Sequence, residues 1–281
     1  MLPGHALSRD LSTRALPPRR ARTSWVRPVE ADSVSDALLT ATREAVTDSL
    51  AAVALSGGHD SAIVLALVRA LGVELRCFVL STKLEGYDER DRALFTSDHF
   101  GADTTVINVD EEDFVAALPD AISAMEVPLY NAHPVGKLLL ARALARHGIR
   151  RVLTGDGADH VMTRDVSADY LPLVGAAFDD AGVTLHAPFL DERVLSLLLA
   201  CPKDRHKAIL REVAHSLGVS DELVGEKKRS RLCPPIPVDH LVRADEHDRL
   251  AARLGRVPPA HDADDRARML WHTTALLLRD A

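Results

Sequence analysis

The sequence has few cysteines, no excess of positive charge and no long apolar run, and each shortage excludes a class of protein. Its three cysteines lie far apart in 281 residues without a CxxC pair, which excludes a disulfide framework and a cysteine zinc site and is typical of a reducing cytoplasm. No apolar run approaches the roughly 20 residues that span a bilayer. We therefore expect a soluble cytoplasmic protein with no membrane partner.

The charge balance argues against a nucleic-acid partner. The formal net charge is -7, whereas binding to phosphate backbones needs clustered lysine and arginine. Hydrophobic residues make up 47% and charged residues 27% of the chain, which is ordinary globular composition. The length suits one folded unit with a tail.

Residues 1–34 are predicted to form a disordered N-terminal tail. The first 28 residues contain four prolines and no clear apolar period. They also carry six arginines against one acidic residue, which is typical of an organelle transit peptide as well. Both interpretations of the tail stay open at this point.

Residues 35–281 are predicted to form one α/β domain. Short apolar runs alternate with helical patterns, which indicates a doubly wound, mostly parallel sheet. No strand pattern follows residue 194, so we expect a nucleotide-binding core at 35–193 and an all-helical part at 194–281. The expected strands are 51–55, 75–80, 104–109 and 150–154, and the expected helices of the core are 32–50, 61–71, 89–100, 111–125 and 135–147.

The stretch SGGHDS at 56–61 carries the clearest chemistry. It follows the buried strand AAVAL and opens a helix, so backbone N–H groups and the positive end of the helix dipole converge where an anion could bind. The ATP-hydrolysing loop GxxxxGK[ST] is absent. The turn offers two hydroxyls instead, and Asp60 supplies an oxygen ligand for Mg²⁺. This arrangement favours release of pyrophosphate, with attack at the α-phosphate of ATP.

SGGxDS resembles the signature of the PP-loop ATP pyrophosphatases, which have a HUP-like fold. Further stretches resemble the synthetase domain of asparagine synthetases and β-lactam synthetases. In family order they are TGDGADH at 154–160, HAPFLDERV at 186–194, KAILRE at 207–212 and the KK pair at 227–228. The resemblance covers roughly residues 35–235. It implies an ATP-dependent ligase that adenylates a carboxylate, releases pyrophosphate and joins the acyl group to ammonia or another amine.

The resemblance also implies site residues. Asp159, with Asp60, would hold Mg²⁺ on the pyrophosphate of ATP, and Lys228 would stabilise negative charge in the reaction. The segment 126–137 resembles the substrate side of the family site, which makes Tyr130, Asn131 and His133 pocket candidates. The ATP and pyrophosphate positions are Leu55, Ser56, Gly57, Gly58, Asp60, Ser61, Val79, Thr154 and Gly155, although Leu55 and Val79 would serve equally as core residues.

Three positions depart from the family pattern. Asp156 stands where asparagine synthetases carry glutamate and β-lactam synthetases tyrosine, so it is the candidate base, although its side chain is one methylene shorter than glutamate. His160 and His186 replace a glutamate and an arginine, and we assign neither a catalytic role. Asp191 is expected to cap the helix that follows it.

The family's N-terminal glutaminase domain, which begins with a catalytic cysteine, has no counterpart in this sequence. We therefore expect the nitrogen to come from free ammonia, a separate ammonia-supplying or carrier protein, an amine-bearing small molecule or an amine within the same substrate. The main alternative is a catalytically degenerate nucleotide-binding subunit or scaffold. A PP-loop protein that modifies tRNA is a further alternative, although the acidic charge and unpaired cysteines argue against it.

Overall fold

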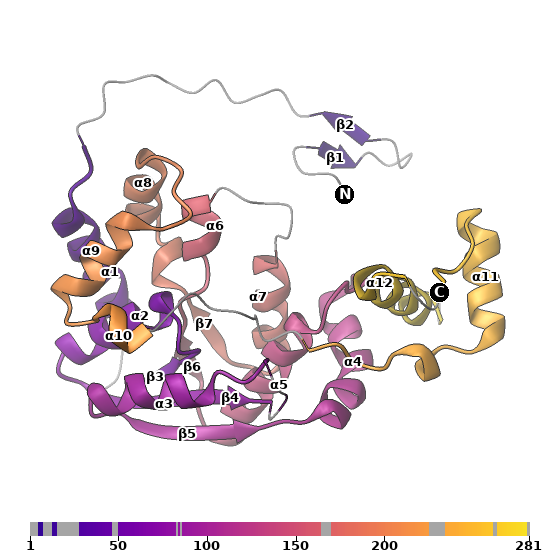
Figure 1. Cartoon of the computed structure of the whole chain (residues 1–281), viewed down its shortest axis with the longest axis horizontal. Helices are drawn as coiled ribbons and strands as arrows, with labels where there is room; N and C mark the ends of the chain where they lie inside the picture. Colours follow the sequence, from indigo (N-terminus) through magenta and orange to yellow (C-terminus); the bar gives the residue numbers. More distant parts are fainter. Residues whose placement is uncertain are drawn as a thin grey trace.

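The computed structural model describes residues 5–7, 13–15, 28–46, 50–82, 84, 86–163, 170–224, 234–260 and 263–279. Its centre is a five-stranded sheet in the order β5-β4-β3-β6-β7, and every neighbouring pair is parallel (Figure 1). The strands are β3 (Leu50–Ala54), β4 (Glu74–Ser81), β5 (Asp103–Asn108), β6 (Arg151–Leu153) and β7 (Thr184–His186). The predicted doubly wound parallel α/β fold is confirmed.

Helices cover both faces of this sheet. Their bounds are α1 (Ala31–Ala45), α2 (His59–Ala70), α3 (Arg90–His99), α4 (Glu111–Met125), α5 (His133–Arg146), α6 (Ala158–Thr163), α7 (Leu171–Asp180), α8 (Glu192–Ala200), α9 (Ala208–Ser216), α10 (Asp221–Val224), α11 (Ala244–Leu254) and α12 (Asp265–Leu277), with 3-10 turns η1 (Pro188–Leu190) and η2 (Asp239–Leu241). In the part of the chain described after β7, every regular element is helical. This agrees with the predicted helical C-terminal part.

The alternation of side chains along β3 explains why helices pack on both faces of the sheet. Val53 packs into a core with α1, α2, α8 and α9, whereas Ala52 and Ala54 pack into a second core with α4, α5 and α7. Successive side chains of a strand point to opposite faces, so a strand buried on both faces reads as the continuous apolar run seen in the sequence.

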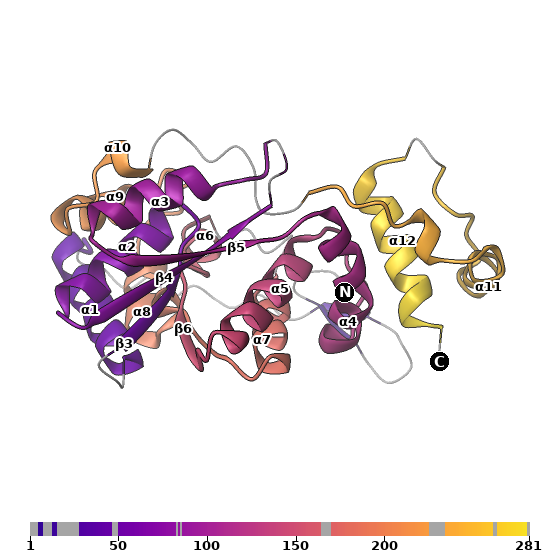
Figure 2. The same cartoon turned by 90° about the horizontal axis from the view of Figure 1, so that it is seen from below.

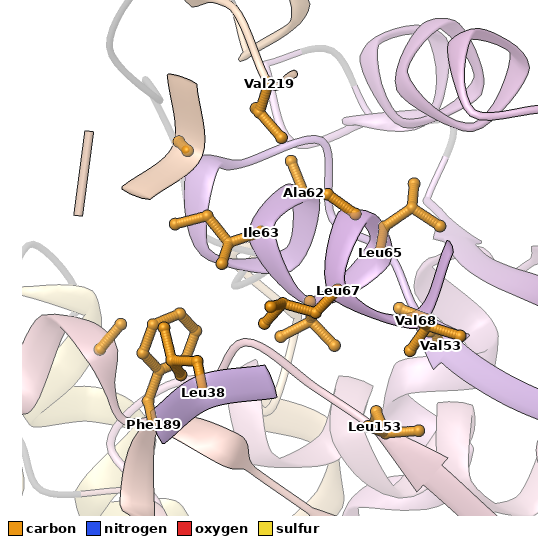
Figure 3. Packing of buried hydrophobic residues seen from close by; sticks show 14 of the residues in the cluster. Leu38, Val53, Ala62, Ile63, Leu65, Leu67, Val68, Leu153, Phe189 and Val219 are labelled. Carbon is orange, nitrogen blue, oxygen red and sulfur yellow. The ribbon is translucent and has the colours of Figure 1, made fainter. Parts of the chain in front are cut away.

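Helix α2 runs through the middle of the first core (Figure 3). Every residue from Ser61 to Val68 is buried, which requires a helix that is apolar on all sides. Leu38 of α1 and Phe189 of η1 close one side of it, and both side chains are fully buried. The first turn of α2 is thereby held at a fixed place at the carboxyl end of β3.

The C-terminal helices α11 and α12 lie beyond α4, at the end of the molecule opposite α1 and α2 (Figure 2). Thr273 of α12 anchors them: its hydroxyl oxygen accepts a hydrogen bond from the Leu129 backbone N–H at 2.9 Å and donates one to the Leu129 carbonyl at 2.8 Å. Across the described residues, no helix is both long and apolar enough to cross a membrane.

The structure contains elements that the sequence did not predict. Strand β7 and helix α7 add a fifth strand and a helix before the HAPFLDERV stretch. Helix α1 begins at Ala31 and buries Val34, ahead of the expected domain start at residue 35. Strands β1 (His5–Leu7) and β2 (Thr13–Ala15) pair antiparallel within the segment predicted to be a disordered tail. Disorder of residues 1–34 stays a prediction.

Candidate functional site

The SGGHDS turn connects β3 to α2 and is closed by its two serines. Ser61 Oγ donates to the Gly58 carbonyl at 3.0 Å and accepts from the Ser56 backbone N–H at 3.2 Å. Gly57 has φ +64°, and a Cβ there would lie 2.9 Å from the backbone nitrogen of Ala93. Gly58 is the N-cap of α2 and has no side chain that could cap the first N–H groups. A helix N-terminus without a side-chain cap suits an anion.

The loop after β6 packs directly on this turn. A Cβ at Gly155 would lie 2.6 Å from the backbone nitrogen of Ser61 and 2.7 Å from the carbonyl carbon of Asp60. Glycine is therefore required for the two loops to meet. Because β3 and β6 are neighbours where the strand order changes direction, this contact lies at the position where open α/β sheets bind ligands.

We expect the Gly155→Ala variant to be destabilised by about 1–3 kcal/mol, because the added methyl group meets backbone that cannot rotate away. Gly175, inside α7, is the matched control: a Cβ there meets nothing within 4 Å. The Gly175→Ala variant should gain about 0.5–1 kcal/mol from helix propensity. Urea unfolding of both variants measures the difference, and equal stabilities would contradict the packing described above.

Asp60 and Asp159, the two predicted metal ligands, come together around the ammonium group of Lys207. Lys207 Nζ lies 2.6 Å and 2.8 Å from the two Asp60 carboxylate oxygens and 2.7 Å from Asp159 Oδ1. The side chains of Lys207 and Asp60 are 14% and 19% exposed, whereas that of Asp159 is 48% exposed. Burial lowers the pKa of Lys207, but the two carboxylates outweigh it and the net shift is upward. Lys207 is therefore held as a cation.

The backbone around Lys207 is fixed by hydrogen bonds. Asp204 accepts from the backbone N–H groups of His206 at 2.8 Å and Ala208 at 2.7 Å, and its own N–H donates to the Met162 carbonyl of α6. Lys207 has φ +52°, a left-handed conformation that is strained for a residue with a side chain. Such strain persists where the surrounding structure enforces it, which here directs Lys207 toward the two carboxylates.

Asp156, the candidate base, forms a buried ion pair with Lys137 of α5. Lys137 Nζ lies 2.7 Å and 3.0 Å from the two carboxylate oxygens, and the side chains are 15% and 8% exposed. Burial acts to raise the pKa of Asp156, but the charge and hydrogen bonds of Lys137 outweigh it, so the pKa lies below its ordinary value. In this state Asp156 is a stable anion and a weak base.

An aromatic cluster adjoins the Asp156–Lys137 pair. Tyr170 makes edge contacts with His133 and His160, and both centroid distances are 4.7 Å. His133 lies one helical turn before Lys137 on α5, and its charge also acts to lower the pKa of Asp156. Of the three predicted substrate residues, His133 therefore lies beside the candidate base.

The other two predicted substrate residues make structural contacts. Asn131 Oδ1 accepts from the backbone N–H of His133 at 3.0 Å, at the start of α5. The Tyr130 ring faces Arg266 of α12, whose guanidinium carbon lies 5.9 Å from the ring centroid. A substrate role for Tyr130 and Asn131 stays a prediction.

The remaining predicted positions divide between core and loop. Leu55 and Val79 are 3% and 1% exposed and pack in the core around α2. Thr154 is buried, and its N–H donates to the His186 carbonyl at 2.9 Å. Lys228 lies outside the described residues, and its predicted role stays a prediction.

Three further side chains come from the SGGHDS and HAPFLDERV stretches. Asp191 caps α8 by accepting from the Arg193 backbone N–H at 3.0 Å, as expected. Burial lowers the pKa of His186, and it lowers that of His59 to about 4. Both imidazoles are therefore neutral near pH 7, and His59 adds no charge at the anion site.

Sequence reasoning assigned no role to Lys207 or Lys137. Lys207 is the first residue of KAILRE, one of the stretches that carries the family resemblance. Its place in that stretch was the only feature of the sequence that could have pointed to a functional role. Lys137 closes the segment 126–137, four residues after His133. This is the helical spacing that places both side chains on one face of α5.

One family of known proteins matches part of this chain. The sequence model of the asparagine synthase family matches residues 33–164, which include β3, α2, the SGGHDS turn and the loop with Asp156 and Asp159. The solved NMN synthetase of Francisella tularensis aligns over 88% of this chain and 94% of its own, at 16% identity and a TM-score of 0.47.

The curated relatives are much longer than this chain. "Amidase chry2" of Gibberella zeae is 34% identical over 144 residues, which are 46% of this chain and 22% of the relative. "Amidase chyE" of Penicillium rubens is 33% identical over 123 residues, 38% of this chain and 18% of the relative. A putative glutamine-hydrolyzing asparagine synthetase of Mycobacterium tuberculosis is 33% identical over 107 residues, 38% of this chain and 16% of the relative.

The family match and the geometry coincide. The matched residues contain the SGGHDS turn, the glycine contact between the two loops and both carboxylates that meet at Lys207. Residues 33–164 of this chain are therefore similar to the asparagine synthase family, and this similarity supports an ATP-dependent ligase.

Proposed function

We propose that this protein is an AMP-forming ligase that adenylates a carboxylate with ATP, releases pyrophosphate and joins the acyl group to ammonia or another amine. One observation carries the proposal: Asp60 and Asp159 come from the first turns of two helices, α2 and α6, and meet at a single cation beside the SGGHDS turn. Two converging carboxylates next to a helix N-terminus that has no side-chain cap suit a divalent metal bound to pyrophosphate.

In the first step, a carboxylate oxygen attacks the α-phosphorus of ATP, and the bond to the bridging oxygen of the β-phosphate breaks. Gly57, Gly58 and the serines of the turn would hold the departing pyrophosphate with N–H and O–H groups. Mg²⁺, held by Asp60 and Asp159, would supply charge neutralisation of that leaving group. Lys207, already within reach of the same carboxylates, adds a further positive charge.

In the second step, the amine attacks the acyl carbon, AMP departs, and a proton leaves the amine. Asp156 is the candidate acceptor because it lies one residue after Gly155, which contacts the turn. The Lys137 pair makes it a weak base, so this role requires the ammonium group to move or the substrate to displace it. Lys228 is our candidate for stabilising the negative charge of both steps.

The buried cysteine supports ligation over the tRNA-thiolating alternative. Burial raises the pKa of the Cys77 thiol to about 12, so the nucleophilic thiolate is not formed near neutral pH. Cys201 is the other described cysteine, and the two form no disulfide with each other. Neither offers the paired active-site thiols that thiolation needs.

We expect ATP–pyrophosphate exchange in the presence of Mg²⁺ and one member of a panel of amino and other carboxylic acids. Hydroxylamine serves as a small nucleophile that traps the acyl-adenylate as a hydroxamate, which mass spectrometry identifies together with AMP. Exchange with one acid identifies half of the substrate pair. The full panel is repeated with amines to detect a reaction that requires the amine first.

The degenerate nucleotide-binding subunit is a second candidate, because Asp156 is held as an anion by Lys137. It predicts binding of ATP with neither exchange nor hydroxamate under every combination of acid and amine. That result would replace the ligase proposal.

A further inference from the structure

Lys207 Nζ occupies the point where the divalent cation is expected. It lies 2.6 Å from Asp60 Oδ2 and 2.7 Å from Asp159 Oδ1. Magnesium–oxygen distances are about 2.0–2.1 Å, so a metal ion bound to both carboxylates would stand close to the present position of the ammonium group. The ammonium group and the metal ion therefore compete for the same two carboxylates.

The described part of the protein offers too few ligands for a metal site of its own. Among the described residues, no group of three or more histidine, cysteine, aspartate and glutamate side chains could hold a metal ion. Mg²⁺ prefers octahedral oxygen coordination and is commonly bound through one or two carboxylates together with substrate phosphates. Asp60 and Asp159 supply the carboxylates, and the missing oxygens must come from water or from a phosphate.

The positive charge of Lys207 also opposes binding of a metal ion in the absence of nucleotide. Asp60 and Asp159 carry two negative charges, and Lys207 already neutralises one of them. A divalent cation that entered with Lys207 in place would meet a like charge within a few ångströms in a largely buried site, which is strongly unfavourable. Entry of the cation requires another partner for the ammonium group.

The triphosphate of ATP provides both missing features, since it brings phosphate oxygens for the metal ion and negative charge for Lys207. We propose that Lys207 makes binding of the divalent cation conditional on ATP: its ammonium group holds Asp60 and Asp159 in the free protein and transfers to the phosphates when nucleotide and metal ion enter together. This inference rests on the proposed ATP site and adds an order of binding to it.

The architecture around Lys207 suits a movement of the side chain alone. Asp204 fixes the backbone through the N–H groups of His206 and Ala208, and the left-handed φ of +52° sets the direction in which the side chain leaves the chain. The long flexible stem of lysine then lets the ammonium group change partners while α9 stays in place.

The test uses Mn²⁺ as the probe and the full chain. Electron paramagnetic resonance measures Mn²⁺ bound without nucleotide, and fluorescence of a labelled ATP measures nucleotide binding in EDTA. The Lys207→Met variant should bind Mn²⁺ alone about 10-fold more tightly than wild type, and metal-free ATP about 10-fold more weakly, within the usual range of coupling between two ligands. If Lys207 only held the local structure together, the variant would bind both Mn²⁺ and ATP more weakly.

Three variants serve as controls. Lys203→Met removes an exposed lysine four residues earlier and should change neither affinity. Lys207→Arg keeps the charge and should bind Mn²⁺ alone as weakly as wild type. Asp60→Asn added to Lys207→Met should lose the gained Mn²⁺ affinity, which locates the ion at these carboxylates. Lys207→Gln replaces the methionine variant if circular dichroism shows that the latter is unfolded.

Wild type that binds Mn²⁺ as tightly without nucleotide as it does with ATP overturns the inference, and this measurement needs no folded variant. Loss of both affinities in Lys207→Met overturns it as well. If wild type binds ATP normally in either case, the proposed ATP site stands, and pyrophosphate exchange still decides between the ligase and the degenerate subunit. Absence of ATP binding in wild type would overturn the proposed function and the inference together.

Discussion

The Asp60→Asn variant is expected to lose AMP and pyrophosphate formation by about a thousandfold, which corresponds to the several kcal/mol that a metal ion contributes to charge stabilisation in a transition state. Asp60 and Asp159 are the two carboxylates that converge beside the SGGHDS turn, so the Asp159→Asn variant should behave alike. The fold should persist, because each variant leaves Lys207 one carboxylate partner. ATP–pyrophosphate exchange with the acid found in the panel measures the loss.

Asp91 supplies the matched control for this prediction. Its side chain is fully exposed on α3, so the Asp91→Asn variant removes a carboxylate of the same type without touching the site. It should retain wild-type exchange. Circular dichroism and urea unfolding check that any loss in the other two variants is not a loss of fold. Wild-type exchange in both Asp60→Asn and Asp159→Asn would remove the metal site from the mechanism.

The central strand β3 was predictable because it is buried on both faces. The stretch at 51–55 reads as an unbroken apolar run, and the structure shows why: alternate side chains enter two different cores. Strand β7 escaped prediction because its three residues, Thr184 to His186, are too few to show a period. Its place in the sheet comes from pairing with β6, a tertiary contact that no local pattern encodes.

The sequence predicted those parts of the site whose functional groups lie within one short segment or motif. The SGGHDS turn contains its own donors, and the family resemblance placed Asp159 near Asp60. The two lysines were not predictable in the same way. Lys207 is 147 residues from Asp60, and a long flexible side chain gives no sequence signal for the partner it will reach. Lys137 comes from a helix that is positioned by packing in the second core.

The Lys137→Met variant is expected to be destabilised by about 3–5 kcal/mol at pH 7, because it leaves the Asp156 carboxylate as an unpaired buried charge. The matched control is Arg249→Met on α11. It breaks an ion pair with Asp245 in which the side chains are 64% and 56% exposed. Exposed pairs contribute about 0–1 kcal/mol, so the control should remain close to wild type. Urea unfolding at pH 7 compares both variants.

The loss of stability in Lys137→Met should depend on pH in a definite direction. In wild type the pKa of Asp156 is depressed, so the stability that it contributes is present above the ordinary value of 3.8 and is lost as pH falls through the lower folded pKa. Without Lys137, burial, the largest effect, is opposed only by the smaller effects of His133 and Thr154, so we expect the pKa of Asp156 to rise. Protonation then relieves the unpaired charge. The stability difference between wild type and Lys137→Met should therefore shrink as pH is lowered from 7 toward 4.

A double-mutant cycle separates the ion pair from the packing of the lysine stem. Adding Asp156→Asn to Lys137→Met removes the stranded charge, so the double variant should recover most of the lost stability and show no acid-dependent recovery. The coupling energy should exceed about 1 kcal/mol, as for residues in direct contact. Equal destabilisation in the single and double variants would mean that the lysine stem stabilises through packing. Asp156 would then not be held as an anion by Lys137, and its role as a base would no longer depend on displacing that partner.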